Sequence, residues 1–121
     1  VTMSEMLKLS PSGTYAHPLL YDEKGDPKEE ISYEEATLYI LRCAGILREG
    51  VSEDLLFKKH IGGFKYLLKQ YTLDEVLYMA EICAEESLTL GSILDVDRFS
   101  RDATTRVHDK LSRLAWVRGD A

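Results

Sequence analysis

The segment Thr72–Leu88, with the sequence TLDEVLYMAEICAEESL, contains the clearest helical signal in the chain. It opens with a capping box, in which the side chains of Thr72 and Glu75 satisfy backbone amide groups that the first helical turn leaves without partners. Apolar residues then recur at steps of three or four, as on one face of a helix: Val76, Leu77, Ala80, Cys83, Ala84 and Leu88. We therefore predict an amphipathic helix that starts at Thr72 and ends before Gly91.

A second capping box lies upstream, in the run Ser32-Tyr33-Glu34-Glu35. Apolar residues follow it at helical spacing, namely Ala36, Tyr39, Ile40, Cys43, Ile46 and Leu47. Gly50 comes directly after this pattern, and glycine is typical of the C-terminal end of a helix. We expect a helix that begins at Ser32 and ends near Gly50.

The next helix is predicted to begin at Ser52, which is followed by two acidic residues. Its pattern is interrupted by the pair Gly62-Gly63, and each glycine weakens a helix by roughly 1 kcal/mol relative to alanine. We therefore expect a kink or a break before the helix resumes at Phe64.

The last predicted helix runs from about Val96 to Trp116. Its apolar residues follow each other at steps of three or four: Val96, Phe99, Ala103, Val107, Leu111 and Leu114. This spacing predicts one continuous helix that packs along the others.

Residues 1–31 differ from the rest because they hold every proline of the chain and two glycines: Pro11, Gly13, Pro18, Gly25 and Pro27. No long helix can cross them, and we interpret them as an irregular arm. Within it, Met3–Leu9 is expected to form a helical turn and Leu19–Tyr21 a short extended piece before a turn. The apolar side chains of the arm can pack on the helices or on a second copy of the chain, and the sequence leaves both open.

Together these patterns predict an all-α protein. We expect a small bundle of four to five helices over residues 32–121, preceded by the irregular arm over residues 1–31. A length of 121 residues is sufficient for one hydrophobic core. Cys43 and Cys83 are too far apart for a disulfide scaffold or a metal knuckle, and we expect both to be buried, reduced thiols.

The net charge of −6 argues against general adsorption to DNA or to anionic membranes. The apolar stretches are far shorter than the roughly 20 residues that span a bilayer, and the N-terminus lacks a signal pattern. We therefore expect no membrane association and a cytoplasmic location. Nucleic acid could bind only through a locally basic face.

Charge is distributed unevenly along the chain. Residues 22–35 carry seven acidic residues and two lysines, a local charge of −5, whereas Leu55–Gln70 contains four lysines and no acidic residue. Lysines, aromatic rings and bare glycine backbone together are typical of surfaces that bind phosphate or bases. The candidate binding residues are Lys58, Lys59, His60, Lys65, Tyr66 and Lys69, with Arg106, Lys110 and Arg113 at helical spacing in the last helix. The same cations could instead form ordinary solvated helix faces, or bind an acidic protein surface.

No catalytic or metal-binding pattern is found. His17, His60 and His108 have no Cys, Asp or second His at a metal-ligand spacing, and we expect His60 and His108 at the surface of their helices. Adjacent Glu-Glu pairs point about 100° apart on a helix and cannot share a site. A phosphate-binding glycine loop and a serine nucleophile elbow are missing. The sequence thus predicts a binding protein without enzymatic activity, metal or cofactor.

The run Ile61–Leu77, IGGFKYLLKQYTLDEVL, resembles a pattern in helical modules of phage and plasmid replication-initiation proteins, including DnaD-like ones. In that family the helices bind DNA and deliver the replicative helicase, and the resemblance places Lys58, Lys59, Lys65 and Lys69 on the DNA side. The Tyr, Ile and Trp signature that ends the DnaD-like module is not reproduced around Leu111–Trp116.

Two hypotheses of different kinds follow for the function. The first is a nucleic-acid-binding adaptor associated with replication, of phage or mobile-element origin, which acts through the basic segment. The alternative is a protein-protein interaction module, such as a phage inhibitor, chaperone or assembly factor, which acts through the acidic region and the arm. A small enzyme of unrecognised type is a third, weaker hypothesis.

Overall fold

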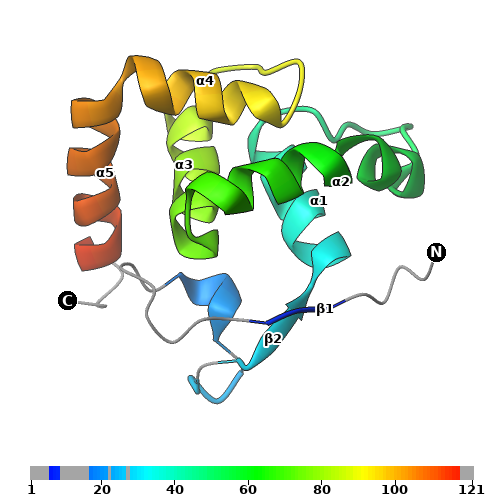
Figure 1. Ribbon diagram of the computed structural model, residues 1–121, viewed down its shortest axis with the longest axis horizontal. Coiled ribbons are helices and arrows are strands. Elements are labelled where there is room, and N and C mark those ends of the chain that lie inside the picture. Colours follow the sequence, from blue (N-terminus) through cyan, green and yellow to red (C-terminus); the bar gives the residue numbers. More distant parts are fainter. Residues whose placement is uncertain (1–5, 9–16, 22, 27, 118–121) are drawn as a thin grey trace.

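Helices dominate the computed structural model of the chain, which describes residues 6–8, 17–21, 23–26 and 28–117 (Figure 1). The helices are α1 (Tyr33–Cys43), α2 (Glu53–Gln70), α3 (Leu73–Glu85), α4 (Leu94–Asp102) and α5 (Thr104–Val117). The N-terminal part adds the strands β1 (Met6–Lys8) and β2 (Glu30–Ser32) and the short 3-10 helix η1 (Pro18–Leu20). The predicted all-α class, a small helical bundle, is confirmed.

Helix α3 forms the centre of the bundle. It packs against all four other helices, and α2 crosses in front of it in Figure 1 while α4 lies above and α5 descends at one side. The core is built around its side chains, including Leu77, Tyr78 and Ile82, which are fully buried. This burial explains why the apolar pattern of Thr72–Leu88 gives the clearest helical signal.

The predicted N-terminal caps of the first three helices are confirmed. The hydroxyl oxygen of Ser32 accepts a hydrogen bond from the Glu35 amide at 3.1 Å, and that of Ser52 accepts one from the Leu55 amide at 3.4 Å. At α3 the Thr72 amide donates to the Glu75 carboxylate at 3.0 Å, as a capping box requires.

Two of the predicted helix ends are wrong. Helix α1 stops at Cys43 rather than near Gly50, because Gly45 takes a left-handed conformation (φ +77°) in which its amide donates to the Arg42 carbonyl. Helix α3 stops at Glu85, since Ser87 also has positive φ (59°) and the Leu88 amide donates back to Cys83. The apolar residues beyond each end still pack on the core as loop residues.

The expected break at Gly62-Gly63 does not occur, and α2 runs unbroken from Glu53 to Gln70. A Cβ atom on Gly63 would lie 2.5 Å from the Cγ2 atom of Ile93 and 3.3 Å from Leu94. Gly63 therefore allows the start of α4 to approach the backbone of α2 closely, and this packing offsets the poor helix propensity of glycine.

The last predicted helix, from Val96 to Trp116, is in fact two helices. It turns sharply at Ala103 (φ −126°, ψ 37°), where α4 ends and α5 begins. The Thr104 hydroxyl donates to the carbonyl oxygens of Ser100 and Arg101, at 3.2 and 3.0 Å, which stabilises the end of α4. The side chains of residues 114–117 lie outside the part of α5 whose side chains are described.

The described residues of the N-terminal arm pack on the helices of the same chain. Met6–Lys8, expected within a helical turn, is instead a strand that pairs antiparallel with β2, and Leu7 lies opposite Ile31. In the piece Leu19–Tyr21, which was expected to be extended, Leu19 and Leu20 belong instead to the 3-10 helix Pro18–Leu20, whereas Tyr21 forms a β-bridge. Other parts of these predictions, such as residues 3–5 and 9, lie outside the described residues. Leu7, Leu19 and Leu20 pack against the core of the same chain. The structure therefore contains the first of the two arrangements that the sequence left open.

The two cysteines differ in burial. Neither is in a disulfide, and Cys83 is fully buried in α3, where burial raises the pKa of its thiol to about 11. Cys43, the last residue of α1, is only half-buried, contrary to the prediction. None of the helices described here is both long and apolar enough to cross a lipid bilayer.

Candidate functional site

Helix α2 has two faces of opposite character. Its inner face, which packs into the core, consists of Leu56, Phe57, His60, Phe64 and Leu67. Its outer face is exposed along the whole helix and consists of Leu55, Lys58, Lys59, Gly62, Lys65, Tyr66, Lys69 and Gln70. From Lys58 to Lys69 this outer face is about 16 Å long, at the usual rise of about 1.5 Å per residue. The structure therefore brings all four lysines of the basic segment onto one exposed surface.

The four lysines of the outer face differ in their partners. Lys58 forms an ion pair with Asp54 at 3.1 Å, and both side chains are largely exposed, so this ion pair is weak. The ammonium group of Lys65 lies 5.1 Å from the centre of the Tyr33 ring. Within the part of the chain that the structure describes, Lys59 and Lys69 form no ion pair.

Apolar side chains accompany the lysines. Leu55 is 66% exposed and Tyr66 is 48% exposed, and both lie on the outer face. Leu94, which is 45% exposed, contacts α2 from the start of α4 beside Gly63. A Cβ atom on Gly62 would meet no atom within 4 Å, so the middle of the face is open down to the helix backbone. The surface thus combines cations, an aromatic ring and accessible backbone.

His60 is not part of this surface, contrary to the prediction. It lies on the inner face and is only 4% exposed. Burial, and secondarily the charge of Lys59, lowers the pKa of its imidazole. A neutral, buried ring supports the packing of α2 and is out of reach of a ligand on the outer face.

The cations of the last helix do not join the α2 lysines. Arg106 and Lys110 on α5 both bind Glu86 at the end of α3, at 3.5 and 2.7 Å. The hydrogen bond from Lys110, together with the charge of Arg106, lowers the pKa of the Glu86 carboxyl. These two cations attach α5 to α3, while Arg113 is exposed on α5. The three predicted cations of α5 therefore lie on a different helix from the four lysines, and two of them are engaged with Glu86.

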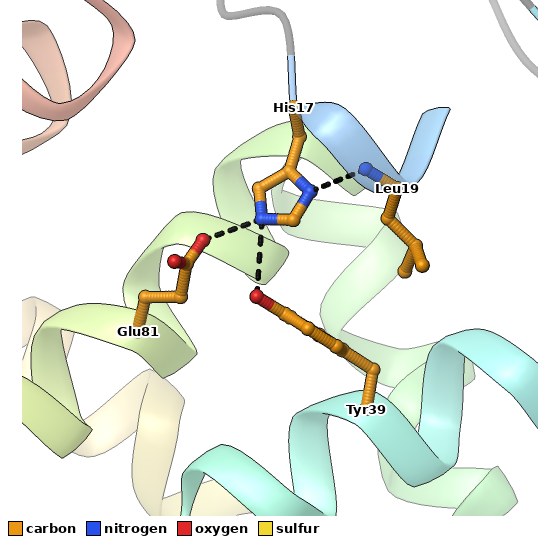
Figure 2. A network of polar contacts seen from close by, with 4 residues as sticks. All are labelled: His17, Leu19, Tyr39 and Glu81. Carbon is orange, nitrogen blue, oxygen red and sulfur yellow. Dashed lines mark hydrogen bonds and ion pairs between the residues drawn. The ribbon is translucent and has the colours of Figure 1, made fainter. Parts of the chain in front are cut away.

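A buried polar network that the sequence did not indicate connects the arm to the bundle (Figure 2). His17 is 2% exposed, and its Nε2 atom lies 2.5 Å from the Glu81 carboxylate on α3 and 3.4 Å from the Tyr39 hydroxyl on α1. The Leu19 amide donates to Nδ1, so the ring proton lies on Nε2 and faces Glu81. Burial, with smaller contributions from Cys43 and Glu81, strongly raises the pKa of Tyr39.

His, Glu and Tyr side chains in contact could in principle transfer protons, but a substrate cannot reach a ring as buried as that of His17. We interpret the network as the anchor of the arm. The contact between His17 and Glu81 links residues 64 positions apart, and no local sequence signal marks it. Over the described residues, no group of three or more His, Cys, Asp or Glu side chains is arranged to hold a metal ion.

Comparisons with models of protein families, with curated proteins and with solved structures give no match for this chain. The resemblance of Ile61–Leu77 to replication-initiation modules therefore stays a prediction, and the functional argument depends on the surface of α2.

Proposed function

We propose that this protein is a non-catalytic binding module that contacts the phosphate backbone of a nucleic acid through the outer face of α2. The observation that carries the proposal is the placement of four exposed lysines around an open glycine on one helix face, in a chain whose net charge is −6. Such local concentration of cations attracts phosphate groups although the rest of the surface repels them.

The uneven charge also supports an oriented encounter. The described acidic residues near the N-terminus, among them Glu23, Asp26, Glu29 and Glu30, are exposed on and before β2, at the lower edge of the molecule in Figure 1. A polyanion is repelled by this region and attracted by the outer face of α2, so it approaches from one side. A role in phage or plasmid replication is the cellular context that the sequence resemblance favours.

The test is a fluorescence-anisotropy titration with labelled DNA at two salt concentrations. The double variant Lys59→Ala/Lys69→Ala is the informative one, because Lys58 and Lys65 also contact groups of the protein itself. Loss of two phosphate contacts should lower the slope of log affinity against log salt by roughly 1.5 and weaken binding to all sequences alike.

A matched control removes two cations elsewhere. Arg42 on α1 and Arg98 on α4 are exposed and lie outside the outer face of α2, so Arg42→Ala/Arg98→Ala has the same net charge as the test variant. This control should bind almost as well as the parent. Equal loss in both double variants would show that only net charge matters, and absence of binding by the parent would refute the proposal.

A protein partner is the second candidate. The exposed apolar side chains Leu55, Tyr66 and Leu94 beside the lysines favour it, because an acidic protein surface with an apolar centre would cover both. In that case the parent would not bind DNA at either salt concentration.

A further inference from the structure

Resting on the proposed function, we propose further that the ligand is a single strand of nucleic acid and that a base of this strand stacks on Tyr66. The proposal follows from the arrangement of residues on the outer face of α2, from its exposed apolar surface, and from the charge of the whole chain.

The outer face consists of two rows that share Gly62. Residues three or four positions apart lie above one another on a helix. By this spacing Lys58, Gly62, Lys65 and Lys69 form one row, and Leu55, Lys59, Gly62 and Tyr66 form the row beside it. The first row is cationic, whereas the second ends in an aliphatic side chain and an aromatic ring. A strand whose phosphates contact the first row and Lys59 directs its bases toward Tyr66.

Tyr66 and Gly62 offer the contacts that a base requires. The Tyr66 ring is half-exposed, and it lies one helical turn beyond Gly62, where no atom lies within 4 Å of the position of a Cβ atom. A flat base can therefore approach the backbone at Gly62 and cover the ring of Tyr66. Leu94, which approaches α2 at Gly63, extends the apolar surface available to a second base. Aromatic stacking of this kind tolerates any base, since every base has a π-face.

A duplex fits the same surface less well. Its bases are already stacked and paired, so their faces cannot cover Tyr66. A duplex also carries one charge per about 1.7 Å, twice the density of one strand, and is repelled more strongly by a chain with a net charge of −6.

The experiment compares labelled oligo-dT with a mixed-sequence duplex of the same length, for the parent, Tyr66→Phe and Tyr66→Leu. The single strand should bind more tightly than the duplex. Tyr66→Phe retains the ring and should bind like the parent, whereas Tyr66→Leu should bind the single strand roughly five- to a hundredfold more weakly. The salt slope should be unchanged in Tyr66→Leu, because no phosphate contact is lost. A ribose strand, oligo-U, should bind like oligo-dT.

The possible failures are distinguishable. If the duplex binds as tightly as the single strand, or if Tyr66→Leu binds oligo-dT like the parent, the single-strand proposal is overturned while phosphate binding by α2 stands. If neither nucleic acid binds the parent, both proposals are overturned. Circular dichroism shows whether each variant is folded. Because Tyr66 is half-exposed, we expect its substitutions to leave the helical spectrum unchanged.

Discussion

Helices α2 and α3 follow each other in the chain and begin with similar caps, yet they have opposite roles. Nine of the thirteen residues of α3 are buried, and α3 packs against all four other helices, whereas α2 leaves one complete face exposed. The exposed face of α2 carries the four lysines, and the side chains of α3 form the centre of the core. The stability that α3 provides thus allows α2 to keep an open, charged surface.

The largest difference in stability between variants of the two helices is expected when one leucine in each helix is replaced by alanine. Leu77→Ala in α3 should destabilise the protein by about 2–5 kcal/mol, because Leu77 is fully buried and a cavity would remain. Leu55→Ala in α2 removes the same atoms from an exposed position and should change the stability by less than about 0.5 kcal/mol. Urea denaturation measures both. A large loss for Leu55→Ala would indicate that a second copy covers the outer face.

The adjacent glycines of α2 allow the buried and the exposed face to be compared within one helix. Gly63→Ala should cost about 1–3 kcal/mol, since its Cβ atom would collide with Ile93. Gly62→Ala meets open space and should instead stabilise the protein by about 0.5–1 kcal/mol through higher helix propensity. Thermal or urea unfolding of both variants tests the opposite signs. If both variants were stabilised, α4 would not pack on α2 as closely as the structure shows.

The caps of the two helices give the next smaller effect. Thr72→Ala should destabilise the protein by about 1 kcal/mol, because it removes the capping residue of the central helix. Ser52→Ala should cost less, since the hydrogen bond from the Leu55 amide is long, at 3.4 Å, and lies at an exposed helix end. The denaturation midpoints provide the test, and an unchanged midpoint for Thr72→Ala would show that the α3 cap contributes nothing.

Local rules predicted the beginnings of α1, α2 and α3, because N-terminal caps act over one turn. They failed where the deciding contact is distant in sequence. Gly63 remains helical because Ile93 packs on it, and the arm is fixed by the contact between His17 and Glu81. Neither partner can be inferred from the residues nearby.

The same limit applies to the candidate site. The four lysines share one face because their spacing is helical, and the sequence pattern was sufficient to group them. The prediction for His60 was wrong although a local signal was present, because His60 lies at helical spacing from the buried residues Phe57 and Phe64. The sequence could not assign Arg106 and Lys110 to Glu86, which lies in another part of the chain.

The smallest effect is expected in the pH dependence of stability, through the inner face of α2. Burial lowers the pKa of His60 in the folded protein below its ordinary value of 6.5. As the pH falls below about 6.5, the unfolded chain therefore binds a proton at this residue before the folded protein does, and the free energy of unfolding decreases. Above that pH both states are neutral at His60 and the contribution vanishes. His60→Gln should remove this part of the pH dependence, while His108→Gln, at an exposed position on α5, should retain it. Urea denaturation at neutral and mildly acidic pH measures the difference. If His60→Gln lost stability on acidification as steeply as the parent, His60 would not be the titrating group on the inner face of α2.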